Sequence, residues 1–341
     1  MVAIINSATI SLSLSTMKVI SMYRYAIKGL SGDEIQTFTS KSPSSKQSIN
    51  NHYPLVLKPN ESFPDDRRFA LLKINENGGK NEALSRFDPN HPKWLHKENF
   101  LCAFSAPALM STFDTEYKVY YPEDNPDFII RQFTIWKRDM KQPRSECLLG
   151  PLNLSNVDDC QRVSNFFSNA YGKSVQLVSA FHQNNEEHLH QFGNTRSGVK
   201  KRNDTRTIHI VNAATIRQVS DAIGISLSPL RFRPNIVVDG LEPWQEFEAV
   251  GKSIQSIADE NDNENNDSLI LDVISKTVRC EGISMDPLYN KDEHNGKDQE
   301  PLDIPKLLQQ YFPQHGPYLG VYAVVREGGT ICEGDTMKIV D

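Results

Sequence analysis

The stretch RFRPNIVVDG, Arg231 to Gly240, contains a predicted strand and, just before it, an arginine that could bind an anion. Asn235 to Val238 is rich in β-branched residues, which favours a strand. Arg233 stands directly before Pro234, and a residue in that position is pushed towards extended backbone geometry. An arginine at the start of a strand can bind a phosphate group through two parallel hydrogen bonds. A surface salt bridge would explain the same arginine, so this stretch alone leaves both interpretations open.

Further candidate strands lie on both sides of this stretch. Each is rich in apolar, β-branched or aromatic residues and is bounded by residues that favour turns. They are residues 19–27, 68–74, 117–121 and 128–136 in the first half, and 175–181, 207–211, 269–278, 320–326 and 337–340 in the second. The pattern predicts an α+β fold that is rich in strands and has only a few helices.

Three segments carry the periodicity of amphipathic helices. Residues 157–171 repeat apolar side chains at helical spacing, and Gly172 follows as a stop. A second helix is predicted after Asn212, with Gly224 at its C-terminal end. A third is predicted at residues 304–311.

Chain length favours two domains. The chain has 341 residues, 38% of them hydrophobic, which exceeds the size at which one core usually divides. We place the boundary near residues 140–155, where Pro143, Gly150 and Pro151 break the pattern. Residues 1–16 lack the basic start and long apolar stretch of a secretory signal, so we expect a disordered tail there.

Composition and cysteine usage indicate a soluble intracellular protein, in the cytoplasm or an organelle. The formal net charge is -6, which gives no global reason to expect binding to nucleic acid. No apolar run approaches the roughly 18 to 20 residues of a membrane span, so we expect no transmembrane anchor. The five cysteines form no CxxC pair, which argues against a disulfide framework or a structural zinc site.

Cys280 is the leading candidate for a reactive thiol, in the stretch VRCEGISMDP. It follows a strongly apolar strand and directly follows Arg279. A cation beside a thiol favours the thiolate, which is both a nucleophile and a metal ligand. An inert buried cysteine is the alternative. For Cys102 and Cys332 we expect a contribution to stability only.

Two further basic clusters are candidates for anion binding. DDRRFALL, residues 65–72, places Arg67 and Arg68 just before a strand. KKRNDTRT, residues 200–207, combines basic side chains with hydroxyls such as that of Thr205. Both residue types can donate hydrogen bonds to phosphate oxygens. A solvated basic loop would explain the second cluster equally well.

Taken in order along the chain, six segments resemble one protein family. They resemble the N-terminal β-barrel-like domain and the following MOSC domain of bacterial YcbX-like proteins and mitochondrial amidoxime-reducing components. The segments are YRYAIKGLSGDE at 23–34, DDRRF at 65–69, DTRTIHIVNAATI at 204–216, RFRPNIVVDG at 231–240, RCEGISMDP at 279–287 and LGVYAVVREGGTICEGD at 319–335. The resemblance therefore covers nearly the whole chain.

This resemblance implies a fold, a cofactor and a set of site residues. The fold is an N-terminal β-barrel-like domain at residues 17–145, followed by a MOSC β-barrel domain at residues 155–341. The cofactor is molybdenum–molybdopterin, with Cys280 as the ligand to the metal and Asp286 as a second catalytic residue. The expected cofactor-binding residues are Lys28, Arg67, Arg68, Thr205, Arg233, Asn235, Arg279 and Tyr322. We expect Lys28, Arg67 and Arg233 to converge on one pocket, with Arg68 alongside or in a structural salt bridge.

The function implied by the resemblance is a molybdenum-dependent oxidoreductase. It would reduce small N-hydroxylated substrates with electrons from a separate protein, such as a b-type cytochrome, a ferredoxin or a flavin reductase. A non-enzymatic carrier of the cofactor or its sulfur is the alternative. Without the resemblance, the residues support only a β-rich module that binds a phosphate-bearing ligand.

Two polar segments look like surface insertions. Residues 258–268 are acidic and rich in asparagine, so they cannot pack a core and should be mobile and lie away from the metal. Residues 289–300 are similar but follow the Cys280 motif directly. We therefore expect the second segment to be the better candidate for docking an electron donor.

Overall fold

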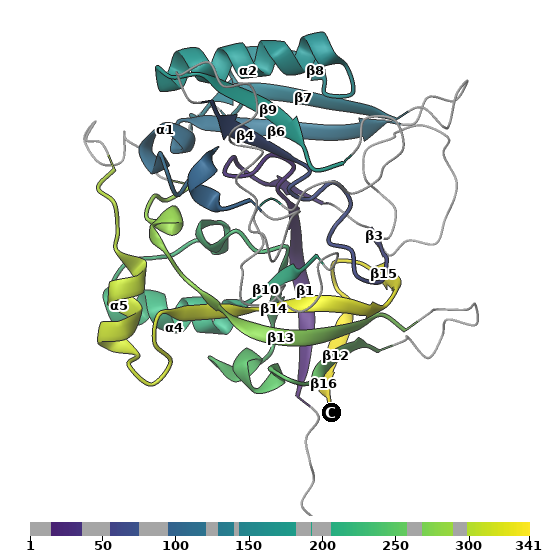
Figure 1. The fold of residues 1–341 in the computed structure, drawn as a ribbon. Helices are drawn as coiled ribbons and strands as arrows, with labels where there is room; N and C mark the ends of the chain where they lie inside the picture. The colour runs from purple at the N-terminus through teal and green to yellow at the C-terminus, as the bar shows by residue number, and fades with distance from the viewer. Residues whose placement is uncertain are drawn as a thin grey trace, which may run out of the picture.

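The chain folds into a β-rich structure with few helices, which confirms the predicted α+β class (Figure 1). The computed structural model describes residues 15–35, 55–74, 95–120, 129–139, 143–181, 192, 206–257, 268–288 and 299–341. The α-helices of these residues are α1 (Pro107–Ser111), α2 (Val157–Tyr171), α4 (Ala213–Ile223) and α5 (Ile304–Tyr311). None of the helices in this part of the chain is long and apolar enough to cross a membrane.

A closed barrel forms one half of the molecule. Its strands are β1 (Thr16–Arg24), β10 (Ile208–Asn212), β11 (Ile236–Asp239), β12 (Ser253–Ser256), β13 (Ile270–Val278), β14 (Tyr318–Glu327) and β16 (Thr336–Val340). Their order is β11-β10-β14-β13-β12-β16-β1, and the pairing of β1 with β11 closes the ring. All neighbours are antiparallel except β10 and β11. Buried side chains such as Val19, Ile210 and Leu271 fill the interior.

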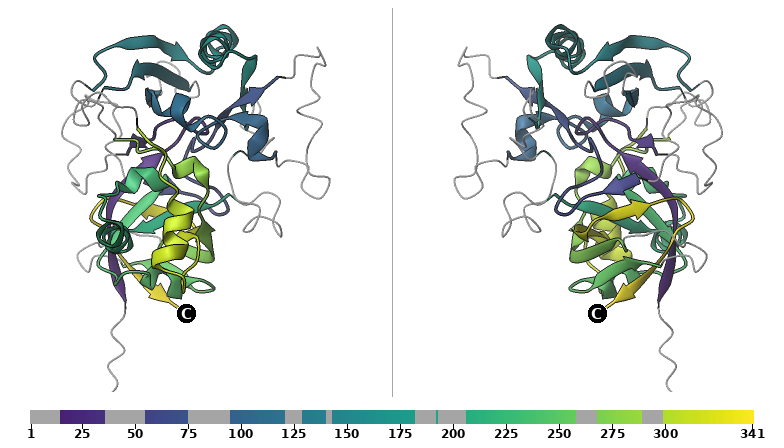
Figure 2. Two further views of the ribbon diagram at one scale, coloured as in Figure 1. Left: turned by 90° about the vertical axis from the view of Figure 1, so that its left-hand side faces the viewer. Right: turned by 90° about the vertical axis from the view of Figure 1, so that its right-hand side faces the viewer.

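The other half holds two small sheets, and we call it the two-sheet half. One sheet has the order β5-β4-β9 and the other β6-β7-β8. Their bounds are β4 (Phe69–Lys73), β5 (Phe100–Leu101), β6 (Phe113–Tyr120), β7 (Ile130–Lys137), β8 (Cys147–Asn153) and β9 (Val175–Ser179). Helix α2 lies at the end of the molecule far from the barrel (Figure 2). It buries Val163 and Phe167 in the core of this half.

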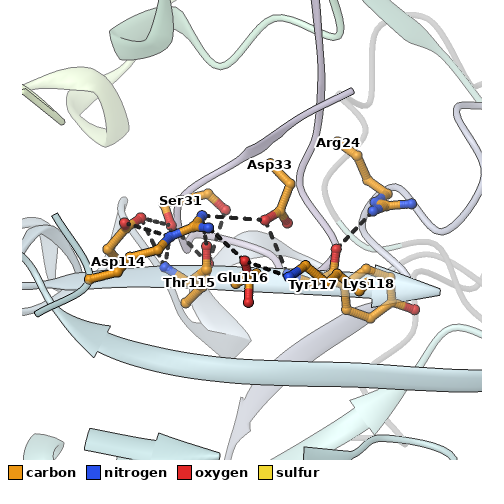
Figure 3. A network of polar contacts seen from close by, with 9 residues as sticks. Arg24, Ser31, Asp33, Asp114, Thr115, Glu116, Tyr117 and Lys118 are labelled. Carbon is orange, nitrogen blue, oxygen red and sulfur yellow. Dashed lines mark hydrogen bonds and ion pairs between the residues drawn. The ribbon is translucent and has the colours of Figure 1, made fainter. Parts of the chain in front are cut away.

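Segment 25–34 follows β1 and connects the barrel to the two-sheet half. Strand β2 (Asp33–Glu34) pairs with the end of β1. A polar network holds this segment against β6 (Figure 3). The backbone N–H of Tyr117 donates to Asp33 at 3.1 Å, and the hydroxyl of Ser31 donates to Asp114 at 3.0 Å. Arg144 adds an ion pair to Glu116 at 2.7 Å.

A second connection joins β3 (Leu55–Leu57) to β15 (Gly329–Ile331). Strands β1 and β3 thus each tie residues from the first third of the chain to residues near its C-terminus. The division into domains at residues 17–145 and 155–341 stays a prediction. Strand β1 belongs to the first of these ranges, but it completes the barrel that the second range forms.

The break predicted around Gly150 and Pro151 is wrong at the level of secondary structure. Residues 147–153 form strand β8, which lies at the edge of its sheet and pairs with β7. A proline fits there because an edge strand leaves some backbone N–H groups outside the ladder. The predicted insertions at residues 258–268 and 289–300 lie almost wholly outside the described residues.

Candidate functional site

A cavity of about 460 Å³ is lined by residues of both halves. The two-sheet half contributes Arg67 and residues 95–97 and 102–104, and segment 25–34 contributes Lys28. The barrel contributes His209 of β10, the turn before β11, the end of β13 with the turn after it, and Tyr322 of β14. Six predicted site residues lie in this lining: Lys28, Arg67, Arg233, Arg279, Cys280 and Tyr322. The structure therefore brings together segments that lie far apart in the sequence.

The charge of the lining is strongly positive. Lys28, Arg67, Arg233 and Arg279 line the cavity, and among the described residues no carboxylate does. Burial, together with the neighbouring Arg67 and Arg233, lowers the pKa of Lys28 to about 8, against the opposing influence of Cys102 and Cys280. Cations that outnumber the nearby acids favour an anionic ligand.

Arg233 has a left-handed backbone conformation with φ of 55° and ψ of 50°, so the predicted extended geometry is wrong. It ends the 3-10 helix η2 (Pro229–Phe232), where its N–H donates to the Leu230 carbonyl oxygen. Its guanidinium carbon lies 4.3 Å from the ring centroid of Tyr25, and its Nη1 donates to the Leu30 carbonyl oxygen at 2.7 Å. These tertiary contacts outweigh the local preference of a residue before proline.

Arg67 resembles Arg233 in its backbone conformation and in its contact with the Tyr25 ring. Its backbone φ is 50°, and its guanidinium carbon lies 5.2 Å from the Tyr25 ring centroid. Its side chain also forms an ion pair with Asp66. A non-glycine residue with positive φ is strained. Two such arginines in one cavity lining indicate that the fold gives up local stability to place these side chains.

Arg279 is held almost entirely by the barrel. Its Nη2 donates to the Phe232 carbonyl oxygen at 2.7 Å, and its Nη1 lies 3.3 Å from Nε2 of His209. The side chain is buried, and burial lowers its pKa below the ordinary value of arginine. Because of these contacts, the guanidinium has little freedom to reorient.

Cys280 lies immediately after β13 and Arg279, at the N-cap position of the 3-10 helix η4 (Glu281–Ile283). Its thiol is partly buried and not in a disulfide, and the residue lines the cavity. Behind it, the buried Arg231 donates to the carbonyl oxygens of Ile283 and Ser284 at 3.1 and 2.8 Å. These bonds fix the turn that presents the thiol.

Of the four remaining predicted site residues, the three that the structure describes do not line the cavity. Asp286 forms an ion pair with Arg231 at 2.9 Å, and Arg68 forms one with Asp65 at 3.0 Å. Asn235 is fully buried; its Oδ1 accepts from the backbone N–H of His209 at 3.1 Å. Thr205 lies outside the described residues. The catalytic role of Asp286 therefore stays a prediction, and its visible contact is a structural one.

The buried polar atoms of the lining fit a phosphate-bearing ligand. Nη2 of Arg233, Nε of Arg279 and Oγ1 of Thr277 are buried and have no hydrogen-bond partner. A buried donor without a partner costs free energy, which a bound oxyanion would recover. Together with the Cys280 thiol, these groups suit a ligand that presents both an anion and a thiophilic metal.

Sequence reasoning missed several residues of the lining, among them His209 and Cys102. His209 sits within the buried strand β10, and Cys102 follows β5. Both occupy positions that look like ordinary core. The signal for His209 was its presence as a polar residue in the apolar stretch IHIV. Cys102 was expected to affect stability only, and its place in the cavity adds a second thiol to the site.

Comparisons with known proteins agree with the resemblance noted in the sequence. Residues 180–338 match the family model of the MOSC domain. No curated protein matches the chain. Among solved structures, the chain is similar to the YUAD protein from Bacillus subtilis, with 10% identity, a TM-score of 0.37 and 95% of each chain covered. It is also similar to YiiM from Geobacillus stearothermophilus, with 17% identity, a TM-score of 0.26, and 39% of this chain and 54% of that one covered.

Both TM-scores are too low to define a shared fold, so the family assignment rests on the matched residues. The match includes all the elements that line the barrel side of the cavity, namely β10, the turn before β11, the end of β13 with the turn after it, and β14. MOSC domains are associated with binding of the molybdenum cofactor. The chain therefore contains a MOSC domain, at residues 180–338.

Proposed function

We propose that this protein binds a pterin-based molybdenum cofactor in the cavity and reduces small N-hydroxylated substrates. A separate redox protein would supply the electrons. One observation carries the proposal: the Cys280 thiol shares a single cavity with Lys28, Arg67, Arg233 and Arg279. A thiol and a group of cations meet two separate needs of such a cofactor, which are a soft metal ligand and partners for a phosphate.

Cys280 would ligate the metal as a thiolate. Thiolates are soft ligands, and neighbouring cations favour the deprotonated form. Arg279 precedes Cys280 in the chain, and η4 with its hydrogen bonds to Arg231 holds the turn in place. When bound, the cofactor would supply the two-electron chemistry, while the protein supplies position and electrostatics.

Arg233 and Arg279 would bind the anionic part of the cofactor. Each has one end of its guanidinium fixed to a backbone carbonyl oxygen, at 2.7 Å in both cases. Each also keeps a buried nitrogen that has no partner. Donors that are already oriented lose little freedom on binding, which strengthens the interaction with an anion. Lys28 would add a further charge, because a pKa of about 8 leaves it mostly protonated at neutral pH.

The test is expression of the full chain in a host that makes the cofactor, followed by quantification of molybdenum and pterin. The proposal expects both in amounts close to one per chain, and turnover of an N-hydroxylated amidine with a chemical reductant. Bound cofactor without turnover would favour the carrier function instead. Protein that takes up neither molybdenum nor pterin would overturn the proposal.

A further inference from the structure

His209 connects two arginines of the cavity, Arg233 and Arg279. It lies in β10, its side chain is buried, and it lines the cavity. Its Nδ1 lies 3.2 Å from the Arg233 carbonyl oxygen, and its Nε2 lies 3.3 Å from Nη1 of Arg279. One imidazole ring therefore contacts the backbone of one arginine and the side chain of the other.

The chemistry of these two partners selects one form of the ring. A carbonyl oxygen can only accept a hydrogen bond, and a guanidinium can only donate. The contacts with Arg233 and Arg279 fit a neutral imidazole with its proton on Nδ1 and its lone pair on Nε2. The Leu319 carbonyl oxygen is a further acceptor beside the ring, and it competes for a proton on the imidazole. Burial and the charge of Arg279 hold the pKa of His209 well below its ordinary value, against the opposing effect of hydrogen bonds to the carbonyl groups of Arg233 and Leu319. A second proton would also set an N–H of the ring against an N–H of Arg279.

Packing around the ring leaves it little room to turn. Its centroid lies 5.2 Å from that of the Tyr322 ring. On another side, a Cβ atom placed at Gly320 would lie 2.9 Å from Nε2 of His209, so only glycine leaves enough space. The backbone of His209 is fixed as well, since its N–H donates to Asn235 Oδ1 at 3.1 Å and its carbonyl oxygen accepts from the Asn235 N–H at 2.8 Å.

We propose that His209 is a positioning residue that fixes Arg279 and Arg233 for anion binding. By accepting from Nη1 of Arg279, it leaves Nε of that guanidinium for a ligand. By donating to the carbonyl oxygen of Arg233, it stabilises the left-handed backbone from which that side chain reaches the cavity. The inference rests on the anionic ligand of the proposed function, and it adds the residue that orients the donors.

The first test is the protonation state of His209 in the full chain. Nitrogen-15 NMR of histidine rings distinguishes a proton on Nδ1 from one on Nε2, and the loss of one signal set in His209→Gln assigns the residue. We expect the Nδ1–H form at neutral and mildly acidic pH. An Nε2–H form, or a ring that titrates like a free histidine, would overturn the inference.

The second test measures the affinity for inorganic phosphate in full chains made by a host that lacks the cofactor. His209→Gln keeps an acceptor that can reach Arg279, whereas His209→Phe keeps a ring of similar shape without either nitrogen. We expect His209→Phe to bind phosphate about tenfold or more weakly and His209→Gln to recover much of that loss. His315→Gln is the matched control, because that histidine stacks on Trp244 outside the cavity lining.

Equal phosphate affinity in wild type and His209→Phe would overturn the inference. If His209→Phe does not fold, the NMR result on the wild-type chain decides the matter. Molybdenum analysis separates this inference from the proposed function. The chain could show the Nδ1–H form and the expected phosphate affinities but take up no molybdenum. The positioning role of His209 would then stand, and the proposed cofactor would be wrong.

Discussion

Arg233 donates from Nη1 to the carbonyl oxygen of Leu30 at 2.7 Å, across 203 positions of sequence. This bond joins the barrel to segment 25–34, which carries Lys28. From the other side, Asp33 and Ser31 of the same segment are bonded to β6 of the two-sheet half (Figure 3). The place of Lys28 in the cavity therefore depends on both halves of the molecule.

Arg233→Ala should lower retention of the cofactor after gel filtration, measured as molybdenum per chain. The change removes a buried charged donor, and such hydrogen bonds contribute on the order of 1.5–3 kcal/mol, or about tenfold or more in affinity. Arg233→Lys should restore retention only in part, since lysine lacks the planar fork. The control is Arg217→Ala, because Arg217 is exposed and pairs with Asp239 away from the cavity. Equal retention in Arg217→Ala and Arg233→Ala would contradict the prediction.

Cys280→Ser should abolish turnover and change the spectrum of the bound metal. A neutral hydroxyl is a hard and weak substitute for a thiolate. Cys332→Ser is the matched control, since Cys332 is buried next to β15 and does not line the cavity. It should reduce the free energy of unfolding but leave the spectrum unchanged. A Cys280→Ser protein with full activity would show that the thiol is not the metal ligand.

Much of the secondary structure could be predicted because its signals are local. Helix α2 begins after Asn156, whose side chain accepts from the backbone N–H groups of Asp158 and Asp159, and it ends at Gly172 with φ of 72°. These are the capping features visible in the sequence. The conformation of Arg233 was predicted wrongly because the local effect of Pro234 is weaker than the contacts that Arg233 makes with Leu30 and Tyr25.

The site was partly predictable for a similar reason. Cys280 and Arg233 lie in short motifs, so their chemistry can be read from neighbouring residues. His209 lies in a buried strand, and nothing in the stretch IHIV reveals that both ring nitrogens contact arginine groups. Cys102 enters the cavity because the loop after β5 meets the barrel, which is a property of the tertiary fold.

Glu246 should make stability depend on pH. It lies in the 3-10 helix η3 (Gln245–Ala249) and accepts hydrogen bonds from Thr215 and Asn212. Burial raises its pKa from 4.5 to about 7, against the opposing effect of those bonds. Between these two values the folded chain holds a proton that the unfolded chain has lost, so the free energy of unfolding should fall as pH rises through this window.

The measurement is urea unfolding of Glu246→Gln and wild type at several pH values. The variant should lose part of the pH dependence and gain stability relative to wild type above the upper value. Part of the dependence should remain, because burial also raises the pKa of Asp33 to about 7. Glu248→Gln is the control, since Glu248 lies in the same 3-10 helix but is exposed. An unchanged pH profile in Glu246→Gln would contradict the assignment.

Gly320→Ala should be more destabilising than Gly224→Ala, although both glycines have similar backbone angles. Gly320 has φ of 75° and Gly224 has φ of 69°. At either position the left-handed backbone would cost an alanine about 1–2 kcal/mol of folding free energy. A Cβ at Gly224 would meet no atom within 4 Å, whereas at Gly320 it would lie 2.7 Å from the Ile210 carbonyl oxygen and 2.9 Å from Nε2 of His209. The difference between the two variants in urea unfolding therefore measures the close approach of β14 to β10.

If His209 is held by this packing, Gly320→Ala should also weaken phosphate binding, while Gly224→Ala should leave it unchanged. Equal losses of stability would mean that β14 moves aside without cost and that the packing does not fix the ring.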